Sequence, residues 1–318
     1  MKPPFFSVIM PVHNKAGHLG RALDSVLNQG FEDFELIIID DASTDKSPEF
    51  IRRVRDARVR KYRRMVPGPG GYAARNLGIS LARAGWIAFL DADDEWLEHH
   101  LHLVHEYLAA HPESDALATG FYLARGQEWI KDSYTRTSPE APGAYVLDTY
   151  LQARLKGLEL ISTNTIVLKK KMVGECPLFP QGRAQRGGDE DTWLRLFLEG
   201  MTMVRLPEPT AVYHLDAGNM VTGKSDNVQG PHPVLTRVRS CWSELDDPGL
   251  KRLMARFANR KSIGWARVAK EAGSSPLPQI KRLTWQGLDM YCLVSALAML
   301  VLPGKIFRRL TARIRGKH

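Results

Sequence analysis

Short apolar runs alternate with helical patterns along the chain. Eight predicted strands share this apolar character and span residues 6–10, 34–39, 59–62, 86–90, 117–123, 160–168, 204–206 and 211–213. Between them, apolar residues recur at intervals of three and four, as at 19–27 and 97–108, which predicts amphipathic helices. Strands that alternate with helices predict a parallel sheet covered on both faces, so the pattern indicates an α/β fold.

Carboxylates directly follow two of these strands. The run 86–90 breaks off into Asp91, Asp93 and Asp94, and the run 34–39 ends at Asp40 and Asp41. Open α/β sheets bind ligands at the carboxyl ends of strands, and aspartate oxygens suit Mg²⁺ or Mn²⁺, which often also hold substrate phosphates. A solvated turn with Asp91 or Asp94 as a helix cap is the alternative. The repetition of polar strand ends favours a metal-dependent site for a nucleotide phosphate.

The end of the first strand excludes several nucleotide-binding classes. The residues that follow it are Pro11, Val12, His13 and Asn14. They contain neither the glycine-rich turn of a dinucleotide fold nor the aspartate of an aspartyl phosphatase. The chain also has no Walker-type Gly-Lys-Ser/Thr phosphate loop.

A second acidic cluster begins a predicted helix. Asp189, Glu190 and Asp191 follow the stretch 182–188, which suits a mobile loop, and they precede an apolar helical face. Acidic residues in a first turn are often only caps and partners of the helix dipole. The residues alone leave this interpretation and a catalytic one open.

Composition is that of a globular protein, but the charge is unevenly distributed. The 318 residues are 44% apolar and 25% charged, which suffices for one large domain or two small ones. The net charge is +9, yet residues 234–318 carry 17 Lys/Arg against 5 Asp/Glu, whereas residues 1–233 carry 27 against 30. Three scattered cysteines match neither a disulfide framework nor a zinc site and indicate a reducing compartment. The first strand begins so early that no signal peptide is expected.

The basic C-terminal quarter contains two helical patterns. Apolar residues at helical spacing between 250 and 268 lie among lysines and arginines and predict a basic amphipathic helix. The uncharged run 290–302 has thirteen residues, fewer than the roughly 20 that cross a bilayer. With the cations behind it, this run favours a segment at the interface of an anionic membrane; a helix buried against the rest of the protein is the alternative. Nucleic acid is not expected, because no recognised nucleic-acid-binding module accompanies the charge.

Five motifs in this order resemble those of the inverting family-2 glycosyltransferases with the GT-A fold, of the bacterial cell-surface polysaccharide type. The motifs are Pro11-Val12-His13-Asn14, Asp40-Asp41-Ala42-Ser43-Thr44-Asp45, Ala74-Arg75-Asn76-Leu77-Gly78, Asp91-Ala92-Asp93-Asp94 and Glu190-Asp191-Thr192-Trp193-Leu194. The resemblance covers about residues 5–220. It implies a doubly wound mixed sheet, with a GT-A catalytic domain at 1–233 and a basic helical extension at 234–318.

The resemblance also implies roles for individual residues. Those implied to bind the nucleoside-diphosphate sugar are Pro11 and Val12 beside the base, Asn14 of the same motif, Asp40 and Asp41 on the uracil and ribose, Arg75 facing the nucleotide and Asp91 at the ribose. Asp93 would bind the divalent cation, and Asp191 would be the catalytic base. The chain has His214 and Asp216 where the family commonly has an arginine and a histidine, so either residue is a candidate for the remaining metal partner.

The implied reaction moves a sugar, expected from a UDP-sugar, to a hydroxyl of a glycan or lipid-linked acceptor with inversion. Mn²⁺ or Mg²⁺ would neutralise the departing diphosphate, and a carboxylate would take the proton of the attacking hydroxyl. A cytoplasmic location at the inner face of the cytoplasmic membrane is expected. The alternative function is that of a non-catalytic protein that binds nucleotide sugars or carbohydrates on the same fold.

Overall fold

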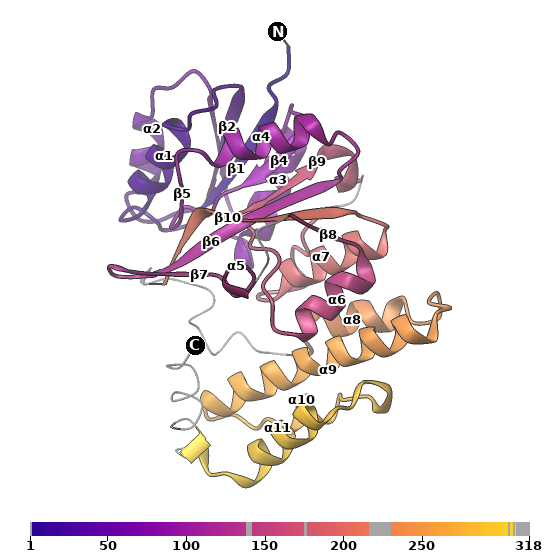
Figure 1. The fold of residues 1–318 in the computed structure, drawn as a ribbon. Coiled ribbons are helices and arrows are strands. Elements are labelled where there is room, and N and C mark those ends of the chain that lie inside the picture. Colours follow the sequence, from indigo (N-terminus) through magenta and orange to yellow (C-terminus); the bar gives the residue numbers. More distant parts are fainter. Residues whose placement is uncertain are drawn as a thin grey trace.

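A mixed sheet of ten strands forms the centre of the protein (Figure 1). The computed structural model describes residues 2–137, 142–174, 177–215, 230–304, 306, 307 and 309. Eight strands form the order β3-β2-β1-β4-β9-β6-β10-β5, while β7 pairs with β6 and β8 with β10. The strands are β1 (Phe6–Val12), β2 (Phe34–Asp41), β3 (Val59–Arg64), β4 (Trp86–Phe89), β5 (Glu95–Trp96), β6 (Ala116–Arg125), β7 (Glu128–Lys131), β8 (Gly143–Tyr145), β9 (Ile166–Lys169) and β10 (Met203–His214).

The two halves of the sheet differ in strand direction. β1 pairs in parallel with β2 and β4, and β2 pairs in parallel with β3, so the predicted parallel arrangement is confirmed there. β9 then runs antiparallel to both β4 and β6, and β6 runs parallel to β10. The mixed α/β sheet implied by the resemblance is therefore confirmed.

Three of the predicted strands have different bounds from those expected. The run 160–168 becomes a strand only at Ile166, because the polar residues Ser162 and Asn164 form a turn in which Ser162 O accepts hydrogen bonds from Thr165 and Ile166. The runs 204–206 and 211–213 are one strand, β10, whose register shifts at Pro209. Proline lacks an N–H for the ladder, so it interrupts the pairing without ending the strand.

Helices cover both faces of the sheet, and each face has its own hydrophobic core. In β1, Ile9 packs into one core while Val8 and Met10 pack into the other. One face is covered by α1 (Leu19–Leu27), α2 (Ser47–Arg53) and α4 (His100–Ala110). The other is covered by α3 (Tyr72–Leu81), α6 (Leu147–Leu155), α7 (Gly188–Leu198), α8 (Pro233–Ser240) and α9 (Pro248–Glu271). Three shorter or more distant helices are α5 (Ser133–Thr137), α10 (Leu277–Ile280) and α11 (Met290–Val301).

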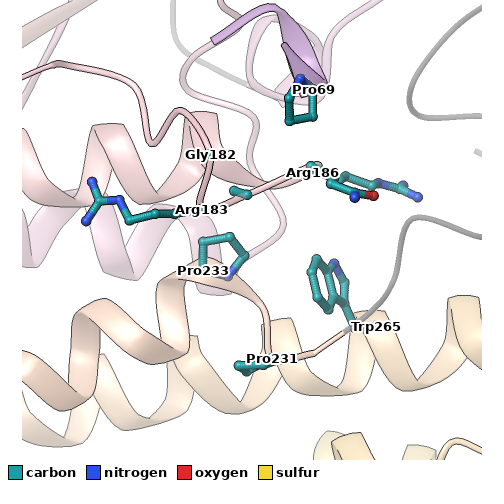
Figure 2. Close-up of a pocket in the computed structure, with 9 residues that line it drawn as sticks. Pro69, Gly182, Arg183, Arg186, Pro231, Pro233 and Trp265 are labelled. Carbon is teal, nitrogen blue, oxygen red and sulfur yellow. The ribbon is translucent and has the colours of Figure 1, made fainter. Parts of the chain in front are cut away.

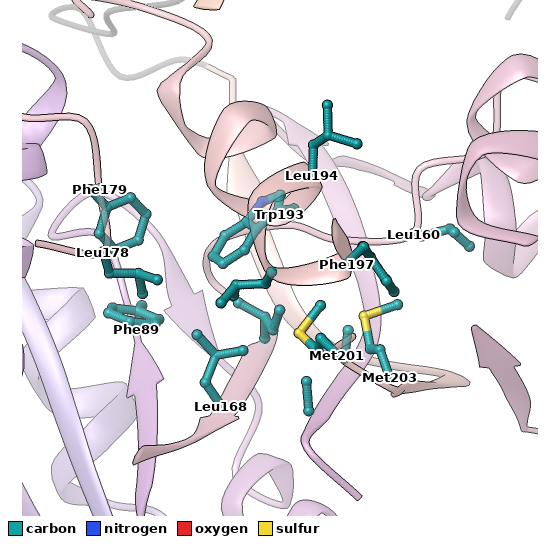
Figure 3. Close-up of a cluster of buried hydrophobic side chains, with 14 of the residues drawn as sticks. Phe89, Leu160, Leu168, Leu178, Phe179, Trp193, Leu194, Phe197, Met201 and Met203 are labelled. Carbon is teal, nitrogen blue, oxygen red and sulfur yellow. The ribbon is translucent and has the colours of Figure 1, made fainter. Parts of the chain in front are cut away.

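Phe179 packs between the end of β4 and the helix α7. Its ring contacts Phe89 of β4 edge to face, with centroids 5.5 Å apart, and Trp193 of α7 in the same way at 5.8 Å. Figure 3 shows these rings in the larger core, which also contains Phe197 of α7 and Leu168 of β9. This packing brings the first turn of α7 close to the carboxyl end of β4.

The C-terminal helices divide between two hydrophobic clusters. Residues of α8 and α9, among them Val234 and Phe257, belong to the same core as the sheet. α11 packs on α9 in a separate small cluster that contains Ile263 and Met299. The division into a catalytic domain at 1–233 and an extension from 234 stays a prediction. Within the part of the chain that the structure describes, every helix is too short or too polar to cross a membrane.

Candidate active site

The loop after β4 carries the three carboxylates Asp91, Asp93 and Asp94, and it is held by Asn164. The Asn164 side chain accepts a hydrogen bond from the Asp91 N–H (2.8 Å) and donates one to the Asp94 carboxylate. Asp94 also accepts the His214 N–H (2.8 Å) and is buried. Burial raises the pKa of Asp94, and the charges of Asp93 and Asp91 add to this effect. Asp94 therefore has a structural role, while Asp91 and Asp93 keep partly exposed carboxylates.

The cap interpretation of this acidic loop is wrong. The residues after it form β5, and α4 begins only at His100 with His99 as its N-cap. The His99 side chain makes no capping hydrogen bond, and the Leu101 N–H in the first turn donates instead to the Gln29 side chain (2.9 Å). The loop thus ends in a strand pair and leaves Asp91 and Asp93 at the carboxyl end of β4.

Cationic side chains from three other places surround these two carboxylates. The buried Arg75 of α3 pairs with Asp91 and donates to the Gly70 carbonyl (2.8 Å). Lys15 Nζ lies 2.5 Å from Asp93, and Arg21 donates to the Asp93 carbonyl oxygen (2.6 Å). The carboxyl end of β4 therefore has carboxylates that can bind a metal cation and, next to them, positive charges that can bind an anion. A metal–diphosphate pair requires both.

The predicted metal partners differ in where they lie. His214 Nε2 is 2.9 Å from Glu95 Oε1, so its ring pairs with β5. Asp216 lies outside the described residues. Among the residues that the structure describes, no group of three or more His, Cys, Asp or Glu side chains is placed to hold a metal ion. The donor set nevertheless fits Mn²⁺ or Mg²⁺, because such ions often use one or two carboxylates and complete their shell with substrate phosphates and water.

The predicted donor-binding residues of β1 and of the loop after it lie at the carboxyl edge of the sheet. Pro11 lies beside Gly71, the left-handed residue (φ 68°) that precedes α3. Val12 is fully buried in the core, so its side chain faces away from solvent. The Asn14 side-chain oxygen accepts the Thr44 N–H (2.7 Å) and thereby joins the loops after β1 and β2. Val12 and Asn14 thus support the carboxyl edge of the sheet through core packing and a loop hydrogen bond, whereas Pro11 lies at this edge beside Gly71.

Asp40 and Asp41 end β2 at the same edge, and both are buried. Asp40 accepts the Ser43 N–H (3.0 Å) and lies 3.4 Å from Arg63. Asp41 pairs with Arg64 and accepts the Gly68 N–H (3.0 Å). Asp41 therefore links β2 to the loop that carries Gly70 and Gly71.

The first acidic residue of α7 points toward this edge. Gly188 donates to the Tyr72 hydroxyl (2.9 Å), which places the start of α7 against α3. The Asp189 carboxylate follows directly in the chain, and Arg75, Tyr72 and Asp91 all act on it electrostatically. Burial raises the pKa of Asp189; Arg75 and Tyr72 oppose the effect, and Asp91 adds to it.

The next two acidic residues pair with cations of the helices α6, α8 and α9. Asp191 is buried and receives two hydrogen bonds of 2.9 Å from the Arg237 guanidinium of α8. Glu190 pairs with Lys261 of α9 and with Arg154 of α6 (2.7 Å). Three consecutive acidic residues thus have different partners, and Asp189 is the one beside Arg75 and Asp91.

A cavity of about 260 Å³ adjoins the loop that leads to α7 (Figure 2). Figure 2 shows Pro69 and Arg186 on one side of it and Trp265 of α9 on the other. Its full lining is Pro69, Gly182, Arg183, Ala184, Gln185, Arg186, Pro231, Pro233 and Trp265. The cavity therefore lies between the glycine loop before α3, the loop before α7 and the C-terminal helices.

Residues 7–167, which are 161 of the 318 residues, match the family described as Glycosyl transferase family 2. The chain belongs to this family. The match begins inside β1, includes β2 to β8 and the Asp91 loop, and ends inside β9. The Asp189 loop, α7 and the C-terminal helices lie beyond it.

Two curated relatives of this family-2 chain come from bacteria. An uncharacterized glycosyltransferase of Haemophilus influenzae is 44% identical over 97 residues, which cover 30% of this chain and 38% of that protein. The amylovoran biosynthesis glycosyltransferase AmsB of Erwinia amylovora is 29% identical over 227 residues, which cover 68% of this chain and 71% of that protein. The chain thus spans well under two thirds of the first relative.

Solved structures share the fold at low sequence identity. Staphylococcus aureus TarS, residues 1–349 in complex with UDP-GlcNAc, has a TM-score of 0.69 and 17% identity, over 88% of this chain and 82% of that one. The mannosyltransferase PcManGT of Pyrobaculum calidifontis, in complex with GDP-Man and Mn²⁺, has a TM-score of 0.58 and 19% identity, over 95% and 88%. These likenesses show the fold of this family-2 chain.

Proposed function

We propose that this family-2 chain transfers a sugar from a nucleoside-diphosphate donor, a UDP-sugar, to a hydroxyl of a glycan or lipid-linked acceptor in cell-surface polysaccharide synthesis. The observation that carries the proposal is the ion pair of Arg75 with Asp91, two residues before Asp93, because both members of this pair also act electrostatically on Asp189 at the start of α7. It combines a carboxylate for a proton with a carboxylate for a cation. The relatives named for polysaccharide biosynthesis and the UDP-GlcNAc complex of TarS support this choice of donor and product.

The diphosphate would bind at the carboxyl end of β4. Asp93 would hold Mn²⁺ or Mg²⁺, which when bound neutralises charge on the departing diphosphate. Lys15 and Arg75, the partners of Asp93 and Asp91, supply two further positive charges there. The Mn²⁺ in the PcManGT complex supports the metal. His214 or Asp216 as a further metal partner remains part of the proposal.

We assign the base to Asp189 in place of Asp191. A general base must be reachable by the acceptor hydroxyl, but Asp191 is buried and forms a two-point ion pair with Arg237. Asp189 has a raised pKa and lies beside Arg75 and Asp91. Deprotonation of the acceptor hydroxyl by Asp189, with attack in a single displacement, would invert the sugar configuration. Asp191 is then a positioning residue that fixes the start of α7 through Arg237.

The cavity in Figure 2 is the proposed entrance for the acceptor. Arg186, which precedes Asp189 by three residues in the chain, lines this cavity. The indole of Trp265 forms another wall. Aromatic and polar side chains together are common in ligand pockets. Residues from α9 would therefore contribute to acceptor binding.

Two aspartate variants test the base. Asp189→Asn should lower the release of UDP from a UDP-sugar with Mn²⁺ roughly 10²- to 10⁴-fold, while UDP binding by calorimetry is retained. The matched variant Asp191→Asn makes the same chemical change and should lower stability more than turnover. A large loss of turnover in Asp191→Asn alone would return the base to Asp191. No turnover by wild-type protein that binds UDP-sugars would favour the non-catalytic binding function.

The proposal also places the protein in the cytoplasm at the inner face of the cytoplasmic membrane. Support comes from the chemistry of the C-terminal helices, which is set out in the next subsection. Nucleic acid is not proposed as a partner.

A further inference from the structure

The helix α11 is apolar on all sides, although most of it faces solvent. Its twelve residues contain no charged side chain. Cys292, Ala296 and Met299 are buried against α9. The large apolar residues on its other sides are exposed by 46–72%, and they are Met290, Tyr291, Leu293, Val294, Leu297, Leu300 and Val301. A surface helix of a soluble protein normally carries polar residues there, so these seven residues, the apolar face of α11, call for a partner.

Exposed apolar side chains continue on both ends of α11. Trp285, just before the helix, is 88% exposed, and Ile306, just after it, is 49% exposed. Figure 1 shows α11 at the end of the molecule that is remote from the sheet, with α9 between them. Tryptophan is enriched at membrane–water interfaces, where its ring meets both the apolar and the polar region.

A basic groove of about 610 Å³ adjoins Trp285 and the start of α11. Lys251, Arg252 and Arg256 of α9 line it together with Trp242. Asp289, also in the lining, pairs with Arg256 (3.6 Å) and Arg260 (2.9 Å). Among the described residues, no carboxylate pairs with Lys251 or Arg252, so these two charges are available to an anion.

Charge and length select among the possible partners. The twelve residues of α11 extend about 18 Å, short of the roughly 30 Å of a hydrocarbon core. A second copy would bring two sets of cations together at the groove, which disfavours self-association. An anionic bilayer matches both features, because its acyl region accepts apolar side chains and its phosphates accept cations.

We propose that α11 lies in the interface of an anionic membrane, with its apolar face at the acyl boundary and with Lys251 and Arg252 at lipid phosphates. The surface is separate from the carboxylates at β4, so the proposal does not depend on the assigned chemistry. Binding there would bring the protein to the surface in which a lipid-linked acceptor is anchored.

Flotation of the full chain with vesicles tests the surface without any donor. Binding is expected to vesicles of phosphatidylcholine with phosphatidylglycerol, and much less to phosphatidylcholine alone. Leu297→Glu should lower the partition coefficient at least tenfold, since it removes one leucine that the membrane would bury. Trp129→Glu on β7 is the matched control, because Trp129 is also exposed (45%) and the charge change is the same. UDP titration and thermal unfolding establish that each variant is folded.

The cations form a second arm of the test. Arg252→Gln should lower binding to the anionic vesicles roughly fivefold, as expected for one cation near the surface, and salt at 1 M should weaken wild-type binding. Equal loss in Trp129→Glu and Leu297→Glu, or equal binding to neutral and anionic vesicles, would overturn the proposal. A wild-type dimer that ignores vesicles and that Leu297→Glu converts to a monomer would assign the face to a second copy.

Discussion

Lys261→Met tests the ion pair between α9 and the acidic start of α7. Lys261 and Glu190 keep 18% and 25% of their side-chain exposure. Removing one partner of a buried ion pair costs about 3–5 kcal/mol, whereas exposed pairs contribute about 0–1 kcal/mol. Glu190 keeps Arg154 and His232 as partners, which limits the loss. We expect the free energy of unfolding at pH 7 to fall by about 2 kcal/mol, between these limits.

The expected loss of stability depends on pH. Burial alone would raise the pKa of Glu190, but Lys261, followed by His232 and Arg154, holds that pKa well below its ordinary value of 4.5. A carboxylate with a depressed folded-state pKa contributes stability that is present above its unfolded pKa and lost as the pH falls through its folded pKa. Lys261→Met raises the folded pKa of Glu190. The difference between variant and wild type should therefore be full at pH 7 and shrink below pH 4.5.

Urea unfolding followed by circular dichroism at pH 7 and pH 4 measures both quantities. Arg252→Met on the same helix is the control, because an exposed substitution of this kind usually changes stability by less than about 0.5 kcal/mol. The ion-pair explanation fails if Lys261→Met is as mild as this control at pH 7. It also fails if the loss is equal at both pH values, which would point to packing of the lysine stem.

Two further predictions concern the metal and the domain boundary. Asp93→Ala should remove the gain in UDP affinity that Mn²⁺ gives the wild type, measured by calorimetry; equal wild-type affinity with and without Mn²⁺ would contradict a metal-bridged diphosphate. A chain that ends at residue 273 keeps α8 and α9 and should fold and bind UDP, whereas one that ends at residue 233 loses part of the sheet's core and should not. A folded 1–233 chain that binds UDP would place the boundary at 233.

Local sequence signals predict the strands of the parallel half because each is a short apolar run bounded by polar residues. The predicted runs 6–10, 34–39, 59–62 and 86–90 all lie within two residues of the bounds of β1 to β4. The run 290–302 likewise matches α11. The strands β7 and β8 lack such a signal, because both are short and partly exposed edge segments whose pairing depends on distant partners.

At the acidic start of α7, the local sequence does not predict which aspartate faces the site. Asp189 and Asp191 are two residues apart, a rotation of about 200° around the helix axis, so they point to nearly opposite sides of a helix. Which of them faces the carboxyl edge depends on how α7 is rotated, and this rotation follows from the packing of Trp193 on Phe179. The partner Arg237 is 46 positions from Asp191. No pattern within the motif contains this information.

The reversed strand β9 also affects how the acidic loop is supported. In a wholly parallel sheet, the residues before each strand lie at the edge opposite the ligand, so only the loops after strands can reach it. Because β9 runs antiparallel between β4 and β6, the residues before it lie at the same edge as the end of β4. Asn164, two residues before β9, can therefore bind the backbone of Asp91 and the carboxylate of Asp94, while its own carbonyl accepts the Trp96 indole N–H (2.6 Å). One change of strand direction thus braces the carboxylate loop from a second segment of chain, about 70 residues further along.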